Sequence, residues 1–297
     1  MMYKPTAKGY FSGCGGMELG LIQAGVNIVQ SLDLDPEATD CMTMNSHYFS
    51  HSILTTDIKD KTVLEQPSTD IIVGTYPCTK YSPIADIHGT RTGDDLFLHF
   101  FRHIAIEKPE MYVVENVPGM KKFQVVMEAM TKLPDYYVKV FCPVDAAIWL
   151  PQRRKRLILI GSRKKYTIAA PNPKSKVPSI KSILEQNPAV DLPAYVIKRI
   201  KGGYRDFPII IDPELDGAIA PTCVAHYAKD LSTRLVKDRA NEFGIRPFSI
   251  REYARLQGFP DDFHFVNKRS SYRLIGNAVP VDMGRWVGEV VMKYFNK

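Results

Sequence analysis

The sequence contains no C-x-x-C pair and no long apolar run, and each absence excludes a class of protein. Its cysteines are odd in number, at Cys14, Cys41, Cys78, Cys142 and Cys223. An odd set without close pairs argues against a disulfide framework and a cysteine-rich zinc site, so we expect free thiols and no metal. No stretch suffices to span a bilayer, and the start, MMYKPTAKGYF, lacks the apolar segment of a signal peptide. We therefore expect a cytoplasmic protein without membrane contact.

An excess of acidic charge is also missing. Lys and Arg number 39 against 32 for Asp and Glu, which gives a net charge of +7. Basic residues gather at 153–165, and again at 198–205, 229–239 and 268–273. Such clusters are typical of proteins that bind nucleic acid, but solvated surface explains most charge runs. Charge alone leaves the partner open.

Short apolar runs alternate with helical patterns in the first half of the chain, which predicts an α/β fold with a parallel sheet. The expected strands are Tyr10-Phe11, Ile28–Leu32, Asp70–Val73, Met111–Val114, Tyr137–Phe141 and Leu157–Ile160. In the helical stretch LFLHFFRHIAI, the apolar stripe leaves His99, Arg102 and His103 on the side away from the core. Near residue 170 the composition turns to Pro, Ser and Lys. We therefore predict a domain boundary near residue 170, with a small, irregular, basic domain after it.

A glycine-rich turn, FSGCGGMELG at residues 11–20, follows the first expected strand. It departs from the dinucleotide fingerprint because Glu18 occupies the third glycine position, so the turn either binds a ligand without phosphates or binds none. Asp33 ends the second strand, where a carboxylate hydrogen-bonds a ribose, and Asp57 stands where a third strand would end, within reach of an adenine. Either aspartate could instead cap a helix. Together they favour an adenosine-type cofactor, with S-adenosylmethionine the leading candidate.

Further chemically active residues follow buried strands. Cys78, in GTYPCTKYS, is either a nucleophile or a small residue that packs at a strand end. Glu115, in VVENVPG, either faces the ligand crevice of the sheet or accepts turn amides. In PQRRKRLILIGS, the spacing of Arg154 and Arg156 predicts that both leave the same face of a strand. Two guanidinium groups there would suit a phosphate and the carbonyl of a pyrimidine.

Taken in order, the segments FSGCGG, TDI, PC, ENV, QRRKR, REYARLQGFP and GNAVP resemble the cytosine-C5 DNA methyltransferases of bacteria and phages. The resemblance implies a Rossmann-like, S-adenosylmethionine-dependent sheet with a small target-recognition domain. The catalytic, cofactor-binding domain would then take residues 1–170 plus 272–297, and the small irregular target-recognition domain residues 171–271. It implies methyl transfer to C5 of a flipped cytosine in double-stranded DNA through a covalent adduct of Cys78, with S-adenosylhomocysteine as product. By the same resemblance Glu115 contacts N3 and the exocyclic amine of the base, Arg156 binds O2, and Arg154 helps to hold the site and a phosphate.

The resemblance also assigns binding residues. Those for the cofactor are Phe11, Gly13, Gly15, Gly16, Leu19, Asp33, Leu34, Asp57, Asn277 and Val279. Those for DNA are Thr79, Lys80, Ser82, Arg153, Tyr227 and Arg234. The chain departs from the family at Thr75-Tyr76-Pro77-Cys78-Thr79, where Gly-Pro-Pro-Cys-Gln is usual, and at Leu34, where an aromatic ring often stacks on adenine. Residues 79–95 are expected to form a loop that closes over DNA, or a static surface loop.

Two rival functions stay open at this point. One is methylation of cytosine in tRNA, and the other is a catalytically silent DNA-binding module. The resemblance implies a prokaryotic or phage host and an enzyme that is monomeric on DNA. It leaves open whether the enzyme is paired with a restriction endonuclease or stands alone.

Overall fold

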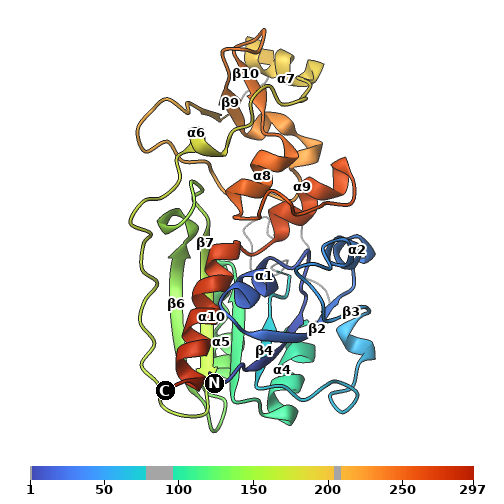
Figure 1. Ribbon diagram of the computed structural model, residues 1–297, viewed down its shortest axis with the longest axis vertical. Helices are drawn as coiled ribbons and strands as arrows, with labels where there is room; N and C mark the ends of the chain where they lie inside the picture. Colours follow the sequence, from blue (N-terminus) through green and yellow to red (C-terminus); the bar gives the residue numbers. More distant parts are fainter. Residues whose placement is uncertain (1, 78–95, 204–208) are drawn as a thin grey trace. The chain divides into compact units, whose positions relative to one another are not determined.

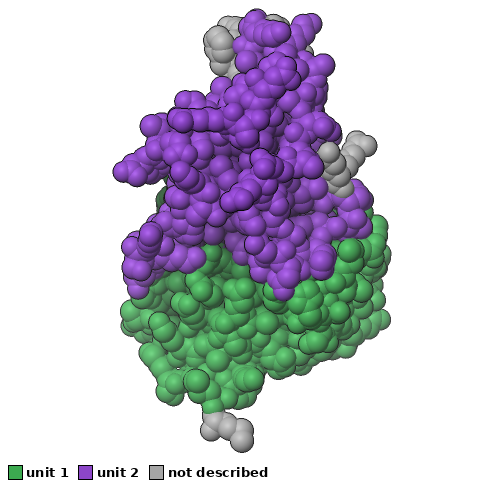
Figure 2. All heavy atoms as spheres, turned by 45° about the horizontal axis from the view of Figure 1, so that its top comes forward, with its two compact units in different colours: residues 1–145, 155–171, 281–297 green, residues 146–154, 172–280 purple. Residues whose placement is uncertain are grey.

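The computed structural model describes residues 2–77, 96–203 and 209–297 (Figure 1). The chain forms two compact units, which Figure 2 shows in different colours. Unit 1 contains residues 1–145, 155–171 and 281–297, and unit 2 contains 146–154 and 172–280. The chain thus leaves unit 1 and returns to it twice. In the described part of the chain, no helix is long and apolar enough to cross a membrane.

Unit 1 is built on a seven-stranded sheet with the strand order β3-β2-β1-β4-β5-β7-β6. Its strands are β1 (Thr6–Tyr10), β2 (Asn27–Asp33), β3 (Ser52–Thr55), β4 (Ile71–Gly74), β5 (Met111–Asn116), β6 (Tyr137–Asp145) and β7 (Lys155–Ser162). The first five pair in parallel, whereas β7 runs antiparallel to both β5 and β6. The expected α/β architecture is confirmed. Parallel pairing brings the ends of β1, β2, β4 and β5 to one edge of the sheet, where ligands bind in open α/β folds.

Two helices from opposite ends of the sequence pack against each other in unit 1. They are α1 (Gly16–Gln23) and α10 (Val281–Phe295), drawn blue and red in Figure 1. A Cβ atom at Gly20 would lie 2.3 Å from the Val281 carbonyl oxygen, and one at Gly284 would lie 2.7 Å from that of Met17. Only glycine allows so close an approach of two helix backbones. The helix that follows the glycine-rich turn is therefore held by the C-terminal helix.

The remaining longer helices of unit 1 are α2 (Pro36–Met44), α4 (Leu96–Glu107) and α5 (Gln124–Thr131). Phe100 and Ile104 of α4 are fully buried in the main apolar cluster, as the stripe predicts. The expectation for His103 was wrong, because this residue is also fully buried, and its Nδ1 atom lies 3.0 Å from the Tyr10 hydroxyl. Burial lowers the pKa of His103 to about 4. The buried face of α4 is wider than its apolar residues alone indicate. A neutral histidine with a tyrosine hydroxyl as hydrogen-bond partner can be buried beside them.

Unit 2 has little regular structure. Its helices are α6 (Ile180–Ile183), α7 (Ala194–Lys198), α8 (Ile250–Leu256) and α9 (Lys268–Asn277). Its sheet has the order β10-β9-β8, from the strands β8 (Ile210–Ile211), β9 (Leu235–Lys237) and β10 (Ile245–Pro247). Three tyrosines, Tyr227, Tyr253 and Tyr272, form a buried group in which the first two rings stack with centroids 4.7 Å apart.

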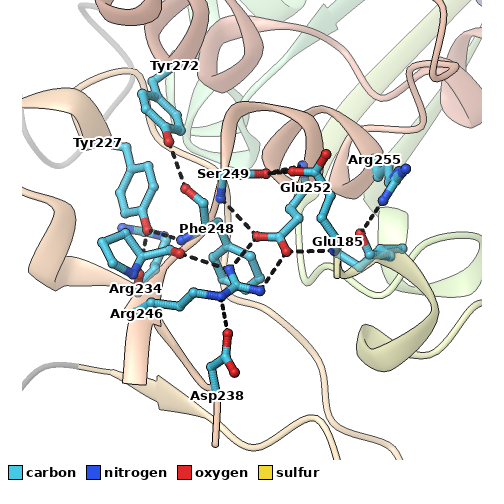
Figure 3. Close-up of polar contacts among 12 residues, drawn as sticks. Glu185, Tyr227, Arg234, Asp238, Arg246, Phe248, Ser249, Glu252, Arg255 and Tyr272 are labelled. Carbon is cyan, nitrogen blue, oxygen red and sulfur yellow. Dashed lines mark hydrogen bonds and ion pairs between the residues drawn. The ribbon is translucent and has the colours of Figure 1, made fainter. Parts of the chain in front are cut away.

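A buried ion pair links β10 to α8 in unit 2 (Figure 3). The guanidinium group of Arg246 donates to both carboxylate oxygens of Glu252, over 2.7 and 2.8 Å, and to Asp238 over 2.6 Å. Glu252 also accepts from the backbone N–H of Ser249, which completes a capping box, and from that of Glu185 over 2.8 Å. One fully buried carboxylate therefore ties together the start of α8, the strand β10 and the segment after α6.

Removing the charge of Glu252 is expected to destabilise unit 2. Glu252→Gln leaves Arg246 buried without its bidentate partner, so we expect a loss of about 3–5 kcal/mol in the free energy of unfolding. Asp261→Asn is the matched control, since Asp261 also forms two bonds to an arginine, Arg255, but its side chain is 65% exposed. There we expect at most about 1 kcal/mol. Chemical denaturation of the full chain measures both, and equal losses would contradict the special role of Glu252.

Candidate active site

The glycine-rich turn after β1 has a backbone that most residues avoid. Phe11, Gly13 and Gly15 all have positive φ angles, of 62°, 57° and 83°. For Phe11 this left-handed conformation costs on the order of 1 kcal/mol or more, and such strain is common at ligand sites. A Cβ atom added at Gly13 would meet nothing within 4 Å, so the turn is open on that side. The turn thus offers bare backbone to a ligand, and α1 begins directly after it.

Asp33, at the end of β2, ties this turn to the neighbouring strand. Its carboxylate accepts the backbone N–H of Gly13 over 2.7 Å and that of Asp35 over 2.9 Å. Burial raises the pKa of Asp33 from its ordinary value, against the effect of these backbone bonds. The next residue, Leu34, is 64% exposed, so it presents an apolar surface beside the carboxylate. A carboxylate and an exposed apolar side chain therefore follow each other at the end of β2, next to the glycine-rich turn.

The other residues assigned to the cofactor have varied surroundings. Asp57 caps the short helix Ile58–Asp60 by accepting from the N–H of Lys59 over 3.0 Å. One of its carboxylate oxygens therefore has the helix-capping role that the sequence left open. Gly16 begins α1, and Leu19 is completely buried in it and presents no surface to a ligand. Asn277 and Val279 belong to unit 2, where Asn277 ends α9 and is exposed while Val279 is buried.

Glu115 and Arg156 form an ion pair in unit 1. The Nε atom of Arg156 lies 2.9 Å from a carboxylate oxygen of Glu115, and the two side chains are only 13% and 9% exposed. They come from the neighbouring strands β5 and β7, whose register pairs Glu115 with Ile158. The pair presents a carboxylate and a guanidinium group together, which can bind the acceptor and donor edge of a pyrimidine.

The chain that leads to Cys78 is fixed to the same region. Thr75 follows β4, and its hydroxyl donates to the Phe11 carbonyl over 2.7 Å. The amide of Asn116, next to Glu115, donates to the Tyr76 carbonyl over 3.1 Å. The Tyr76 ring, at the position where the family usually has proline, is buried, and it lies edge-on to Phe11. Cys78, Thr79, Lys80 and Ser82, like the expected loop over 79–95, lie outside the described residues.

Arg154 does not share a face with Arg156. It is 1% exposed, and its guanidinium group donates to the carbonyls of Cys223, Gly276 and Ala278 within unit 2, over 2.8–3.1 Å. The expectation of a shared face was wrong because β7 begins only at Lys155. Strand alternation therefore does not extend back to Arg154, which in this structure ties segments of unit 2 together.

The residues assigned to DNA contacts in unit 2 differ in exposure. Arg153 is exposed, and Arg234 is half-buried with its Nε atom donating to the Thr222 carbonyl over 2.7 Å. Tyr227 has no exposed surface, and its hydroxyl donates to the Arg234 carbonyl and accepts from the N–H of Phe248. The hydroxyl of Tyr227 thus holds structure together inside unit 2 (Figure 3).

Sequence reasoning missed the chemistry of Glu18. This side chain is 2% exposed, and its Oε2 atom has no hydrogen-bond partner in the described part of the chain. Burial raises the pKa of Glu18 to about 7, the Ser12 hydroxyl and the backbone of Glu18 lower it, and the charge of Asp33 adds to the rise. The available signal was a lone carboxylate within the apolar run GMELGL at the start of a helix.

The raised pKa of Glu18 predicts a stability effect that depends on pH. Below its ordinary value of 4.5 the carboxyl is neutral in both states and costs nothing, whereas above pH 7 the folded protein must bury a charge. The shift corresponds to about 3 kcal/mol of destabilisation at high pH. Glu18→Gln should therefore raise the melting temperature at pH 8 and raise it much less near pH 5. An equal gain at both values would contradict this.

A comparison with known families identifies the chain. The family model described as C-5 cytosine-specific DNA methylase matches residues 9–293. The chain belongs to this family. Among its relatives, the Type II methyltransferase M.Sau96I of Staphylococcus aureus is 27% identical to this chain, over 97% of this chain and 75% of that protein. The Type II methyltransferase M.BsuFI of Bacillus subtilis is 31% identical, over 92% of this chain and 69% of that protein.

Solved structures share the fold of this C-5 cytosine-specific DNA methylase. The Entamoeba histolytica methyltransferase EhMeth superposes with a TM-score of 0.82 at 16% identity, over 99% of this chain and all of that one. The S. pombe Dnmt2 methyltransferase gives 0.77 at 18% identity, over the same shares. At these identities the likeness confirms the methyltransferase architecture and nothing finer.

Proposed function

We propose that this protein transfers a methyl group from S-adenosylmethionine to C5 of cytosine in double-stranded DNA. The observation that carries the proposal is the ion pair between Arg156 and Glu115, which lies near the end of β5. The next residue of β5, Asn116, donates to the carbonyl of Tyr76, two residues before Cys78. Membership of a DNA methylase family favours DNA over tRNA as substrate. The presence of Cys78, Glu115 and Arg156 favours an enzyme over a silent binding module.

The residues of the turn fit the proposed cofactor. The open side of Gly13 admits a ligand close to the backbone, the Asp33 carboxylate suits ribose hydroxyls, and the exposed Leu34 suits one face of adenine. No phosphate is needed, in agreement with the missing third glycine of the dinucleotide fingerprint. The sulfonium of S-adenosylmethionine supplies an electrophilic methyl group. We propose that Asp57, in the same unit, also contacts the cofactor.

The chain's own groups activate the base. Cytosine C5 is a poor nucleophile, and addition of the Cys78 thiolate to C6 makes it enamine-like. In our proposal Glu115 contacts N3 and the exocyclic amine, and stabilises the protonated N3 as electrons move into the ring. Arg156 donates to O2 and is oriented by its 2.9 Å contact with Glu115. After C5 is methylated, loss of the C5 proton and expulsion of Cys78 restore the aromatic base.

DNA recognition is proposed for unit 2 together with the segment after Cys78. The target base must leave the helix before a thiolate can reach C6, as is general for enzymes that act on bases. Lys80 and Arg153 are proposed as phosphate contacts, and Thr79, Ser82 and Arg234 as further contacts to DNA. Tyr227 is not among them because its side chain has no exposed surface. We further propose a monomeric, Type II modification enzyme of a bacterial or phage cytoplasm, which acts alone or beside a cognate endonuclease.

Bisulfite sequencing tests the proposal directly. A plasmid co-expressed with the protein should show methylated cytosines within one short sequence context, and none when the protein is absent. Purified protein with S-adenosylmethionine should also form a covalent adduct with duplex DNA that contains 5-fluorocytosine, since fluorine blocks the final elimination. Methylation of tRNA but not of DNA, or tight DNA binding without an adduct, would overturn the proposal in favour of one of its two rivals.

A further inference from the structure

Thr75 follows β4 at a position where the family usually has glycine. Its backbone N–H donates to the Tyr10 carbonyl over 3.2 Å, a bond that glycine could also form. Its hydroxyl donates to the next carbonyl along the chain, that of Phe11, over 2.7 Å. Glycine has no side-chain donor, so the second bond needs a hydroxyl residue such as threonine or serine at this position.

The carbonyl that Thr75 binds belongs to a peptide group that is held on both sides. The N–H of the same peptide group, from Ser12, donates to the Leu32 carbonyl near the end of β2 over 3.1 Å. Phe11 itself has a φ angle of 62°, a strained conformation for a residue with a side chain. The strained peptide therefore keeps its orientation through bonds to two neighbouring segments, one of which Thr75 supplies.

The residue after Thr75 is held by another part of the candidate site. The carbonyl of Tyr76 accepts from the side-chain amide of Asn116 over 3.1 Å. Asn116 directly follows Glu115 on β5. Thr75 and Tyr76 therefore connect the glycine-rich turn with the end of the strand that carries Glu115. Cys78 comes two residues further along the chain.

We infer that Thr75 is a positioning residue for methyl transfer, because its hydroxyl fixes the chain that leads to Cys78 to the turn assigned to the cofactor. The inference rests on the proposed function. Methyl transfer needs the thiolate, the base and the methyl donor in one geometry, and a misplacement of about 1 Å can lower a rate about 100-fold. Binding of the cofactor alone does not need this alignment. The hydroxyl should therefore affect the rate at saturating cofactor more than the affinity for the cofactor.

Three variants separate the hydrogen bond of Thr75 from the shape of its side chain. Thr75→Val and Thr75→Ala both remove the hydroxyl, the first with the branched shape kept, whereas Thr75→Ser keeps the hydroxyl. In single turnover at saturating S-adenosylmethionine, the first two should lower the rate of methyl transfer at least about 10-fold, and Thr75→Ser should stay within about threefold of the original rate. The affinity for S-adenosylhomocysteine, measured by calorimetric titration, should change less than about threefold in all three.

Thr69→Val is the matched control. Thr69 lies just before the other end of β4, and its hydroxyl also donates to a backbone carbonyl, that of Ile71, over 2.8 Å. Its loss should leave the rate unchanged, and a thermal melt shows whether each variant is folded at the assay temperature. If the two variants without the hydroxyl keep the original rate, or if Thr75→Ser or Thr69→Val loses as much as they do, the positioning role is wrong while the proposed function stands. If the unaltered protein does not methylate DNA, the proposed function fails and this inference fails with it.

Discussion

Cys78→Ser is expected to lower the rate of methyl transfer to DNA by at least about 1,000-fold, because an alcohol at neutral pH is a far weaker nucleophile than a thiolate. Affinity for S-adenosylhomocysteine should not change, since the proposed cofactor turn and Asp33 do not involve this sulfur. The rate is measured in single turnover with tritiated S-adenosylmethionine and a duplex that contains the target sequence found by bisulfite sequencing. The covalent adduct with 5-fluorocytosine should also disappear.

Cys142→Ser provides the matched control for this result. Cys142 is another free, partly exposed thiol of unit 1, on β6. Its replacement should leave both the rate and the adduct in place. A Cys78→Ser protein that methylates at close to the original rate would end the assignment of Cys78, whatever the control shows.

Glu115→Gln is the second large effect that we expect, with a loss of about 100- to 10,000-fold in the same single-turnover rate. Glutamine has nearly the shape of glutamate, but it carries no charge to stabilise a protonated N3 or to hold Arg156 at 2.9 Å. Because neutralising one partner of a nearly buried ion pair also lowers stability, a thermal melt must show that the variant is folded at the assay temperature. DNA affinity at fixed salt should also be retained, because the contact develops mainly as charge builds in the ring.

Glu110→Gln tests whether any glutamate next to β5 has this effect. Glu110 immediately precedes β5 and accepts from the Tyr294 hydroxyl, so its loss alters packing at the other end of the same strand. Its variant should retain the methylation rate. If the two glutamine variants lose rate equally, the effect of Glu115 is a general consequence of disturbing β5, and its proposed contact with the base is wrong.

The sequence predicted the positions of the candidate residues that lie at strand ends. Asp33 and Glu115 follow buried apolar runs, and parallel pairing puts such ends at one edge of a sheet whatever the details of packing. Asp33 and the glycine-rich turn accordingly make contact through Gly13. The order of the motifs then identified the family, which the match over residues 9–293 confirms.

Residues whose roles depend on distant contacts were predicted less well. Arg154 lies one residue before β7 begins. Its three hydrogen-bond acceptors are carbonyl groups from residues 223–278, and the local sequence around Arg154 does not predict these contacts. His103 is buried because of Tyr10, almost a hundred positions earlier in the chain. The sequence showed Glu18 only as a mismatch to the dinucleotide fingerprint. Its burial could not be predicted, because the carboxylate lies where a side chain at Gly9 would be. In each case the deciding partner is far away in sequence.

The close packing of α1 against α10 has a consequence for biosynthesis. Gly20 near the start of the chain and Gly284 near its end each lie against the backbone of the other helix. A nascent chain on the ribosome therefore lacks the packing partner of α1 until residues 281–295 have been synthesised. Copies that lack α10 should therefore be unable to methylate DNA, because α1 has lost the helix against which it packs.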